Sequence, residues 1–148
     1  MIITICILIL AYTLKGKPIG ELVEKVKDVE WKDIAQRIWD SVKSFCLKAG
    51  KKASQPLLTF YYVITDENTP VKDKALVYGA LLYIISPLDL VPRKILGLLG
   101  VLDDTAVAVL VYKKISASVT PEIEKKVKAT LSEWFGDDDD TKLGFVGE

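Results

Sequence analysis

The stretch from Ala75 to Tyr112 constrains the fold more than any other part of the sequence, because almost all of its residues are apolar. Within it, Leu76–Ile85 has no charged residue, and Thr105–Tyr112 is similar in composition. A helix that is apolar on all sides must be buried by protein or contact lipid. We therefore predict an apolar helical hairpin at the centre of the fold. Its charged residues are Asp89, Arg93, Lys94, Asp103 and Asp104.

The first half of the chain has the spacing of amphipathic helices. Pro18–Gly50 is predicted to be helical with a break near Asp28–Glu30, and Gly50 suits the position after a helix end. Ser54–Thr65 is predicted to be a shorter apolar helix. The apolar stripe of the longest helix consists of Trp31, Ile34, Ala35, Ile38, Trp39, Val42, Phe45, Cys46 and Ala49. This stripe predicts a face in the core, although two tryptophans could also lie at a membrane interface.

Two further helices are indicated by their first residues. Thr69-Pro70 and Thr120-Pro121 each place a threonine N-cap before a proline at the first helical position. The last helix is expected to run to about Phe135, and no segment alternates with the period of a strand. The predicted fold is all-α, a compact bundle of about six helices in one domain over residues 15–135. Residues 136–148 are expected to form a flexible acidic tail.

The segment Met1–Leu14 contains no charged residue. A bilayer span needs about 20 apolar residues, so this segment is short for one. Three interpretations remain open: a membrane anchor or shallow insertion, a helix buried in the core, or a removed segment. Lys15 and Lys17 favour a cytoplasmic position for the following residues if the segment inserts. We expect a membrane-associated protein with most of its domain cytoplasmic, or alternatively a soluble cytoplasmic protein.

The composition excludes several kinds of active site. Histidine is absent, which rules out histidine-based triads and imidazole zinc ligands. Cys6 and Cys46 lie in apolar sequence and indicate no disulfide framework. The 20 basic residues equal the 20 acidic ones, which gives no electrostatic drive toward nucleic acid. No phosphate-binding glycine motif occurs. We therefore expect no nucleic-acid partner, assign no catalytic residue and predict no cofactor.

The acids of the hairpin have a structural and a functional interpretation. Ser86, Pro87 and Asp89 resemble a capping box, and Asp103 suits the N-cap of a helix that begins at Asp104. Arg93 and Lys94 could pair with these acids. Alternatively, carboxylates held in apolar surroundings could coordinate Mg²⁺ or Ca²⁺, or could transfer protons. The candidate metal ligands are Asp89, Asp103 and Asp104.

These residues also carry a resemblance to a known family. Tyr83-Ile84-Ile85-Ser86-Pro87-Leu88-Asp89-Leu90-Val91-Pro92, followed by Gly100-Val101-Leu102-Asp103-Asp104, resembles the signature of the YkvA-like domain of unknown function. The similarity covers about Leu57–Lys114, that is, residues 57–114. It implies small, uncharacterised, helical bacterial proteins that associate with membranes and have no established reaction. The candidate motif residues are Tyr83, Ser86, Pro87, Asp89, Pro92, Arg93, Gly100, Asp103 and Asp104.

One departure from the family pattern bears on the chemistry. The family usually has an acid directly after the second proline, where this chain has Arg93. A basic residue there removes a potential cation ligand and favours an internal ion pair. We therefore expect a non-enzymatic, membrane-associated helical module that binds a protein or lipid partner. The alternatives are a divalent-cation-dependent enzyme using the three aspartates and a soluble regulatory or scaffold domain.

Overall fold

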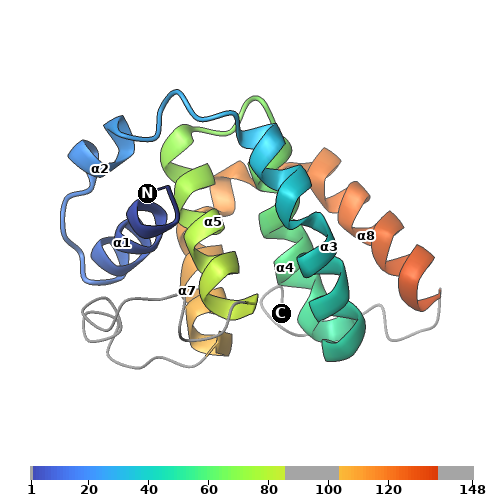
Figure 1. Ribbon diagram of the computed structural model, residues 1–148. Coiled ribbons are helices and arrows are strands. Elements are labelled where there is room, and N and C mark those ends of the chain that lie inside the picture. Colours follow the sequence, from blue (N-terminus) through green and yellow to red (C-terminus); the bar gives the residue numbers. More distant parts are fainter. Residues whose placement is uncertain (1, 86–103, 137–148) are drawn as a thin grey trace.

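The computed structural model describes residues 2–85 and 104–136, and within these it is built of helices without strands, which confirms the predicted all-α class (Figure 1). The side chains of Asp104 and Thr105 lie outside this description. The elements are α1 (Ile2–Leu14), α2 (Gly20–Glu24), α3 (Trp31–Ala49), α4 (Lys51–Thr65), α5 (Val71–Ile85), α7 (Asp104–Lys114), the 3₁₀-helix η2 (Ser116–Ser118) and α8 (Pro121–Phe135).

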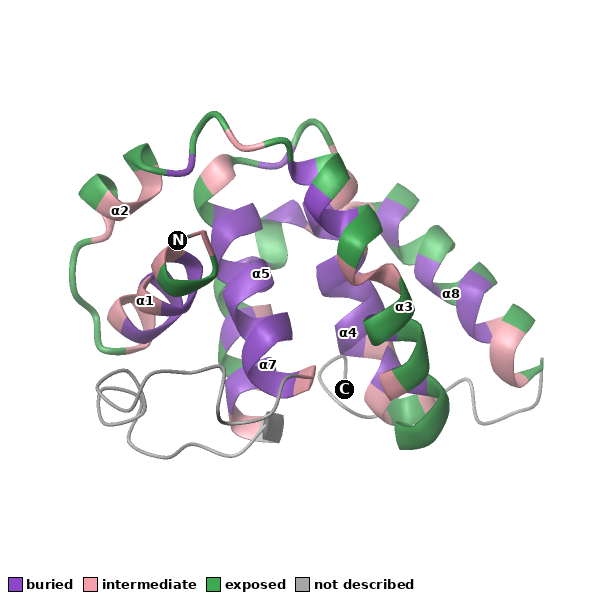
Figure 2. Ribbon diagram, in the orientation of Figure 1, coloured by how far each residue is buried: buried purple, intermediate pink, exposed green. Residues whose placement is uncertain are grey.

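Helix α5 lies at the centre of the bundle. It packs against α1, α3, α4 and α7, and every residue from Asp73 to Ile84 is buried (Figure 2). A helix without a polar face needs neighbours on all sides, and here protein supplies them. The predicted apolar hairpin therefore corresponds to α5 and α7, with α5 as the more deeply buried of the two helices.

Helix α1 packs along α5 through a contact that depends on one glycine. A Cβ atom added at Gly79 would lie 2.4 Å from the carbonyl oxygen of Cys6 and 3.3 Å from Cβ of Leu10. The absence of a side chain at Gly79 thus allows the two backbones to approach closely. Cys6, Ile7 and Leu10 are buried. The structure therefore places the uncharged N-terminal segment in the hydrophobic core as a helix.

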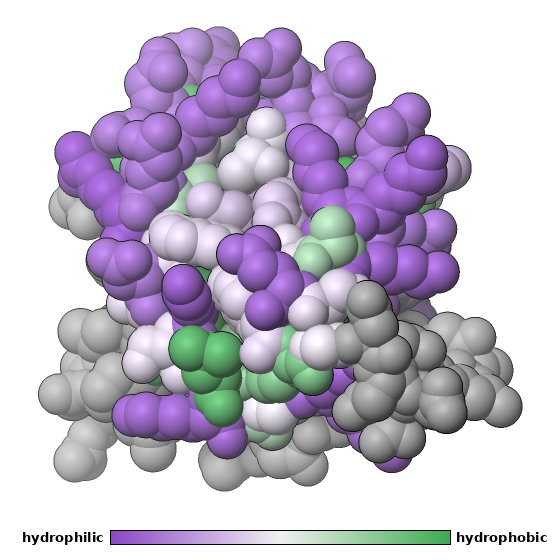
Figure 3. Space-filling view, turned by 90° about the vertical axis from the view of Figure 1, so that its right-hand side faces the viewer, coloured by the Kyte–Doolittle hydropathy of each residue, from purple (hydrophilic) through white to green (hydrophobic). Residues whose placement is uncertain are grey.

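Helices α3 and α8 both pack against α4 on the other side of the molecule. Trp31, Val42 and Cys46 of the predicted α3 stripe are buried, whereas Trp39 and Phe45 are half-buried and Ala49 is exposed. Figure 3 shows the side that carries α8, where a band of intermediate hydropathy lies between hydrophilic margins and meets a hydrophobic patch near its lower end. This side of the bundle is amphipathic, unlike α5.

The helix boundaries correct two predictions. Helix α4 begins at Lys51 instead of Ser54, so Ser54 lies within its first turn. The Ser54 hydroxyl donates to the carbonyls of Gly50 (2.7 Å) and Cys46 (3.0 Å). Helix α5 begins at Val71, one residue later than predicted, and the Pro70 carbonyl accepts from the Lys74 amide at 3.1 Å. Boundary shifts of this size are common because helix ends are irregular.

The predicted start of α8 is confirmed in detail. Thr120 is its N-cap, and the Thr120 Oγ1 accepts from the Ile123 amide at 3.2 Å. Pro121 is the first helical residue, where its missing N–H has no cost. The predicted break near Asp28–Glu30 is also confirmed, since it lies between α2 and α3. Gly50, with φ of 97°, joins α3 to α4.

Candidate functional site

The two helices that carry the motif residues lie side by side, and the last residue of α5 and the first of α7 are at the same end of the bundle (Figure 1). Tyr83 is buried near that end of α5. Helix α7 begins at Asp104, as the sequence predicted. Other motif residues lie outside the described residues: Ser86, Pro87, Asp89, Pro92, Arg93, Gly100 and Asp103. The capping, ion-pair and metal interpretations of these residues therefore stay predictions.

At the opposite end of α5, two buried polar side chains join different parts of the chain. The Ser118 hydroxyl of η2 donates to Oδ2 of Asp73 at 2.5 Å, and both residues are buried. A buried carboxylate is costly unless it accepts hydrogen bonds. This contact fixes the connection between α7 and α8 against the first turn of α5. Sequence reasoning missed it, because Asp73 has the pattern of an ordinary acid in a first helical turn.

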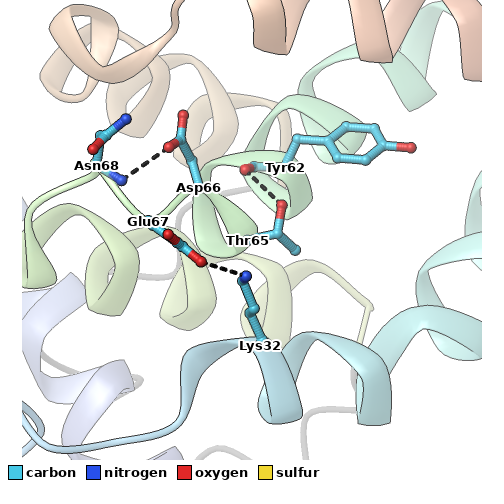
Figure 4. Close-up of polar contacts among 6 residues, drawn as sticks. All are labelled: Lys32, Tyr62, Thr65, Asp66, Glu67 and Asn68. Carbon is cyan, nitrogen blue, oxygen red and sulfur yellow. Dashed lines mark hydrogen bonds and ion pairs between the residues drawn. The ribbon is translucent and has the colours of Figure 1, made fainter.

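Lys74 is the other charged residue buried at this end of α5. Burial lowers the pKa of its ammonium group, while the carboxylates of Asp66 and Glu67 act in the opposite direction. The nearby turn between α4 and α5 has its own contacts, drawn in Figure 4. Lys32 donates to Oε2 of Glu67 at 2.6 Å, and the Asn68 amide donates to Oδ1 of Asp66 at 2.9 Å. Both side chains of the Lys32–Glu67 pair are mostly exposed.

Two open cavities flank this turn, and we call them together the turn cleft. Their volumes are about 360 Å³ and 480 Å³, and both are lined by Asp66, Asn68 and Thr120. Lysines contribute to the walls of each cavity, which mix both signs of charge. Among residues 2–85 and 104–136, no group of three or more acids or cysteines is placed to hold a metal ion. The turn cleft thus offers polar contacts without a recognisable catalytic arrangement.

The two cysteines are buried, and their thiols are expected to react slowly. Burial raises the pKa of the Cys6 thiol to about 12, and burial also raises the pKa of Cys46, against a hydrogen bond from Ser54. The thiolate is the nucleophilic form of cysteine. Both side chains therefore remain neutral at physiological pH and serve as small apolar core residues.

A third feature lies on the α3–α4–α8 side, and we call it the aromatic groove. It is a cavity of about 290 Å³ lined by Gln36, Trp39, Tyr61 and Tyr62. The rings of Trp39 and Trp134 lie 5.5 Å apart at one end of it, so α3 and α8 contact there. Burial raises the pKa of Tyr61. The sequence contained a signal for this groove, since Trp39 lies on the α3 stripe and Trp134 on the apolar face of α8.

On this side of the molecule two lysines lie over aromatic rings, and one hydrogen bond joins α4 to α8. The ammonium groups of Lys43 and Lys126 lie 5.7 Å and 5.9 Å from the ring centroids of Trp134 and Tyr62. At such distances a cation is attracted to the face of the ring. The hydroxyls of Tyr62 and Thr130 are 2.7 Å apart and form a hydrogen bond between α4 and α8. The groove therefore has an aromatic lining, with Lys126 over one of its rings.

Comparison with known proteins identifies the family. A family model described as a protein of unknown function, DUF1232, matches residues 73–110, which include the α5–α7 hairpin motif. A protein of Bacillus subtilis (strain 168) named "Uncharacterized membrane protein YkvA" is 37% identical over 79 residues, covering 49% of this chain and 74% of that protein. The chain belongs to the DUF1232 family of proteins of unknown function, and the resemblance to the YkvA-like domain is confirmed.

A second relative shares a shorter stretch. The zebrafish (Danio rerio) protein named "E3 ubiquitin-protein ligase RNF170" is 55% identical over 40 residues, which are 27% of this chain and 15% of that protein. A similar segment therefore occurs within a much longer protein. No solved structure matches the chain significantly.

Proposed function

We propose that this protein is a non-enzymatic helical module that associates with a membrane surface and binds a lipid or protein partner there. The observation that carries the proposal is the extent of its similarity to the Bacillus relative, whose name describes it as a membrane protein. None of the helices that the structure describes is both long and apolar enough to cross a bilayer. We propose a surface association because apolar side chains of α1 face away from α5, and the cytoplasmic position of the domain stays a prediction.

The outer face of α1 is the proposed contact surface. Ile3 is 40% exposed, and Ile2, Ile5 and Leu8 are partly buried, so apolar side chains also face away from α5. At the end of this helix, the ammonium group of Lys17 lies 5.8 Å from the ring centroid of Tyr12. Aromatic rings and lysines are typical of residues at the boundary between lipid and water. A helix of this kind could lie in the plane of the interface while its inner face stays packed on α5.

Vesicle cosedimentation of the intact protein tests this proposal. We expect the wild type to sediment with phospholipid vesicles, and Ile3→Glu to reduce the bound fraction about tenfold because a charge would enter the interface. Leu47→Glu is the matched control, since Leu47 is 49% exposed but lies on α3. A wild type that does not bind vesicles would contradict the proposal, and so would equal losses in the two variants.

The second candidate function is a regulatory or scaffold domain that needs no lipid. The observation that favours it is the packing of α1 on α5, because the apolar residues Ile7, Ile9 and Leu10 are then covered by the protein itself. Analytical ultracentrifugation of the intact chain without detergent separates the two candidates. A protein that is monodisperse in ultracentrifugation and does not cosediment with vesicles supports the scaffold domain. Vesicle binding that is lost in Ile3→Glu supports the membrane module.

A further inference from the structure

The smaller cavity of the turn cleft has a buried polar floor. Thr69, Asp73 and Ser118 line it, and their exposed fractions are 7%, 8% and 9%. These residues come from the turn before α5, from the first turn of α5 and from η2, so the floor forms only in the folded chain. Polar side chains that are buried so deeply are normally satisfied by hydrogen bonds from protein, water or a ligand.

Part of this floor has no partner among residues 2–85 and 104–136. Oδ2 of Asp73 accepts from the Ser118 hydroxyl, but none of the hydrogen bonds within these residues reaches Oδ1, and none of their ion pairs includes Asp73. The Thr69 hydroxyl forms no hydrogen bond with them either, whereas Oγ1 of Thr120 caps α8. The start of α5 favours a negative charge, but a buried carboxylate is normally also paired with a cation. The floor therefore suits a positively charged group that donates hydrogen bonds.

The rest of the lining argues against a bare metal ion as that cation. Lys72 and Lys114 are exposed and line the same cavity, together with the half-buried Asp66. The two lysines balance the charges of Asp66 and Asp73, so a ligand without net charge suits the lining as a whole. A divalent cation would be repelled by the lysines, and it prefers six or more oxygen ligands. Because Asp73 is buried and the lysines are exposed, the positive group of the ligand belongs at the floor and a negative group belongs near the lysines.

We propose that this cavity binds a small zwitterion of zero net charge, with its primary ammonium group on the floor and its anionic group near Lys72 and Lys114. A primary ammonium has three N–H donors. The floor supplies Oδ1 of Asp73 and the hydroxyl oxygens of Thr69 and Ser118 as acceptors. A volume of about 360 Å³ lies within the range of small-molecule sites. An amino acid and the ethanolamine phosphodiester of a lipid headgroup share this chemistry.

NMR titration of the intact, ¹⁵N-enriched protein tests the inference with soluble probes. Glycerophosphoethanolamine carries the phosphodiester and 4-aminobutyrate carries the carboxylate, so the tighter of the two identifies the source. We expect the tighter probe to shift the amide signals of Thr69, Asp73 and Ser118 with a Kd of about 1 mM or below. Glycerophosphocholine is the matched control, because its quaternary ammonium has no N–H, and it should bind about tenfold more weakly than glycerophosphoethanolamine.

Matched variants assign the two ends of the ligand. Asp73→Asn removes the charge but keeps an oxygen that can accept from Ser118, and it should weaken binding about tenfold. Lys114→Gln changes an exposed residue and should weaken binding about threefold. Lys113→Gln is its control, because Lys113 is exposed on the same helix but does not line the cavity, and it should leave the Kd unchanged. The lysine pair keeps the test decisive if Asp73→Asn does not fold.

Four results would overturn the inference. They are the absence of a saturable shift with either probe up to about 50 mM, equal affinity for glycerophosphoethanolamine and glycerophosphocholine, equal effects of Lys114→Gln and Lys113→Gln, and a shift of the same amide signals by Mg²⁺ or Ca²⁺ alone. The inference does not rest on the membrane proposal, because α1 does not line the cavity. A failed titration would leave vesicle binding that depends on Ile3 unaffected, so the two proposals fail separately.

Discussion

The contact between α1 and α5 and the α3–α4–α8 layer cover apolar surface in different ways. Helix α5 has no polar face and is surrounded by protein, and its contact with α1 depends on the missing side chain of Gly79. Helices α3 and α8 bury one stripe each and leave aromatic rings half-exposed around the groove. The α1–α5 contact is therefore sensitive to small changes in side-chain volume. The α3–α4–α8 layer is stabilised by several contacts, each of which tolerates such changes better.

The largest expected effect comes from a cavity beneath α1. Leu10→Ala removes a fully buried side chain and should lower the free energy of unfolding by about 3 kcal/mol. Ile3→Ala on the same helix should cost less than about 0.5 kcal/mol, because Ile3 is exposed. Urea denaturation followed by circular dichroism measures both values. Similar small losses would mean that α1 is not part of the cooperative core.

A single methyl group added at Gly79 should also disturb the contact between α1 and α5. Gly79→Ala should cost about 2 kcal/mol, because the new Cβ meets the backbone of Cys6 rather than a flexible side chain. It should also speed the reaction of Cys6 with a thiol reagent by loosening α1. Gly20→Ala is the control, since nothing lies within 4 Å of its added Cβ. Unchanged thiol reactivity in Gly79→Ala would contradict the proposed steric role.

The stability of the protein at alkaline pH tests the burial of Cys6 without removing an apolar side chain from the α1–α5 contact. The Cys6 pKa is raised from 9.0 to about 12 by burial, so above pH 9 the unfolded chain releases this proton while the folded chain keeps it. The stability linked to Cys6 is complete below pH 9 and decreases as the pH rises toward 12. Between about pH 8 and 10, the wild type should lose about 1 kcal/mol more than Cys6→Ala. Parallel pH profiles would show that Cys6 is accessible to water.

The smallest effect is expected on the other side of the molecule. Tyr62→Phe removes the hydrogen bond to Thr130 and should cost about 0.5 kcal/mol, because the Thr130 hydroxyl keeps its hydrogen bond to the Lys126 carbonyl. Tyr12→Phe is the control, since the described residues offer its hydroxyl no hydrogen-bond partner. A loss above about 2 kcal/mol for Tyr62→Phe would mean that the groove is as tightly packed as the α1–α5 contact. Urea denaturation again provides the measurement.

The candidate motif was easier to find than to interpret. The spacing of Pro87, Asp89, Pro92 and Asp103 carried the family resemblance, and the comparisons confirm the family. The Asp73–Ser118 contact and the aromatic groove were not predicted, because each joins residues from helices that are distant in the sequence. The periodicity of a helix shows which of its faces is apolar, but it does not identify the helix that covers that face.

The sequence by itself determined the helical class, the start of α8 at Thr120-Pro121 and the need to bury Leu76–Ile85 on all sides. These follow from local backbone preferences and from the cost of exposing apolar surface to water. The tertiary structure alone decided how the helical part of the N-terminal segment, Ile2–Leu14, is accommodated. An uncharged helix suits lipid or a protein core equally well, and the choice depends on whether a neighbour has the right shape. Gly79 gives α5 that shape, because it lets the backbone of α1 come close enough to cover Cys6 and Leu10.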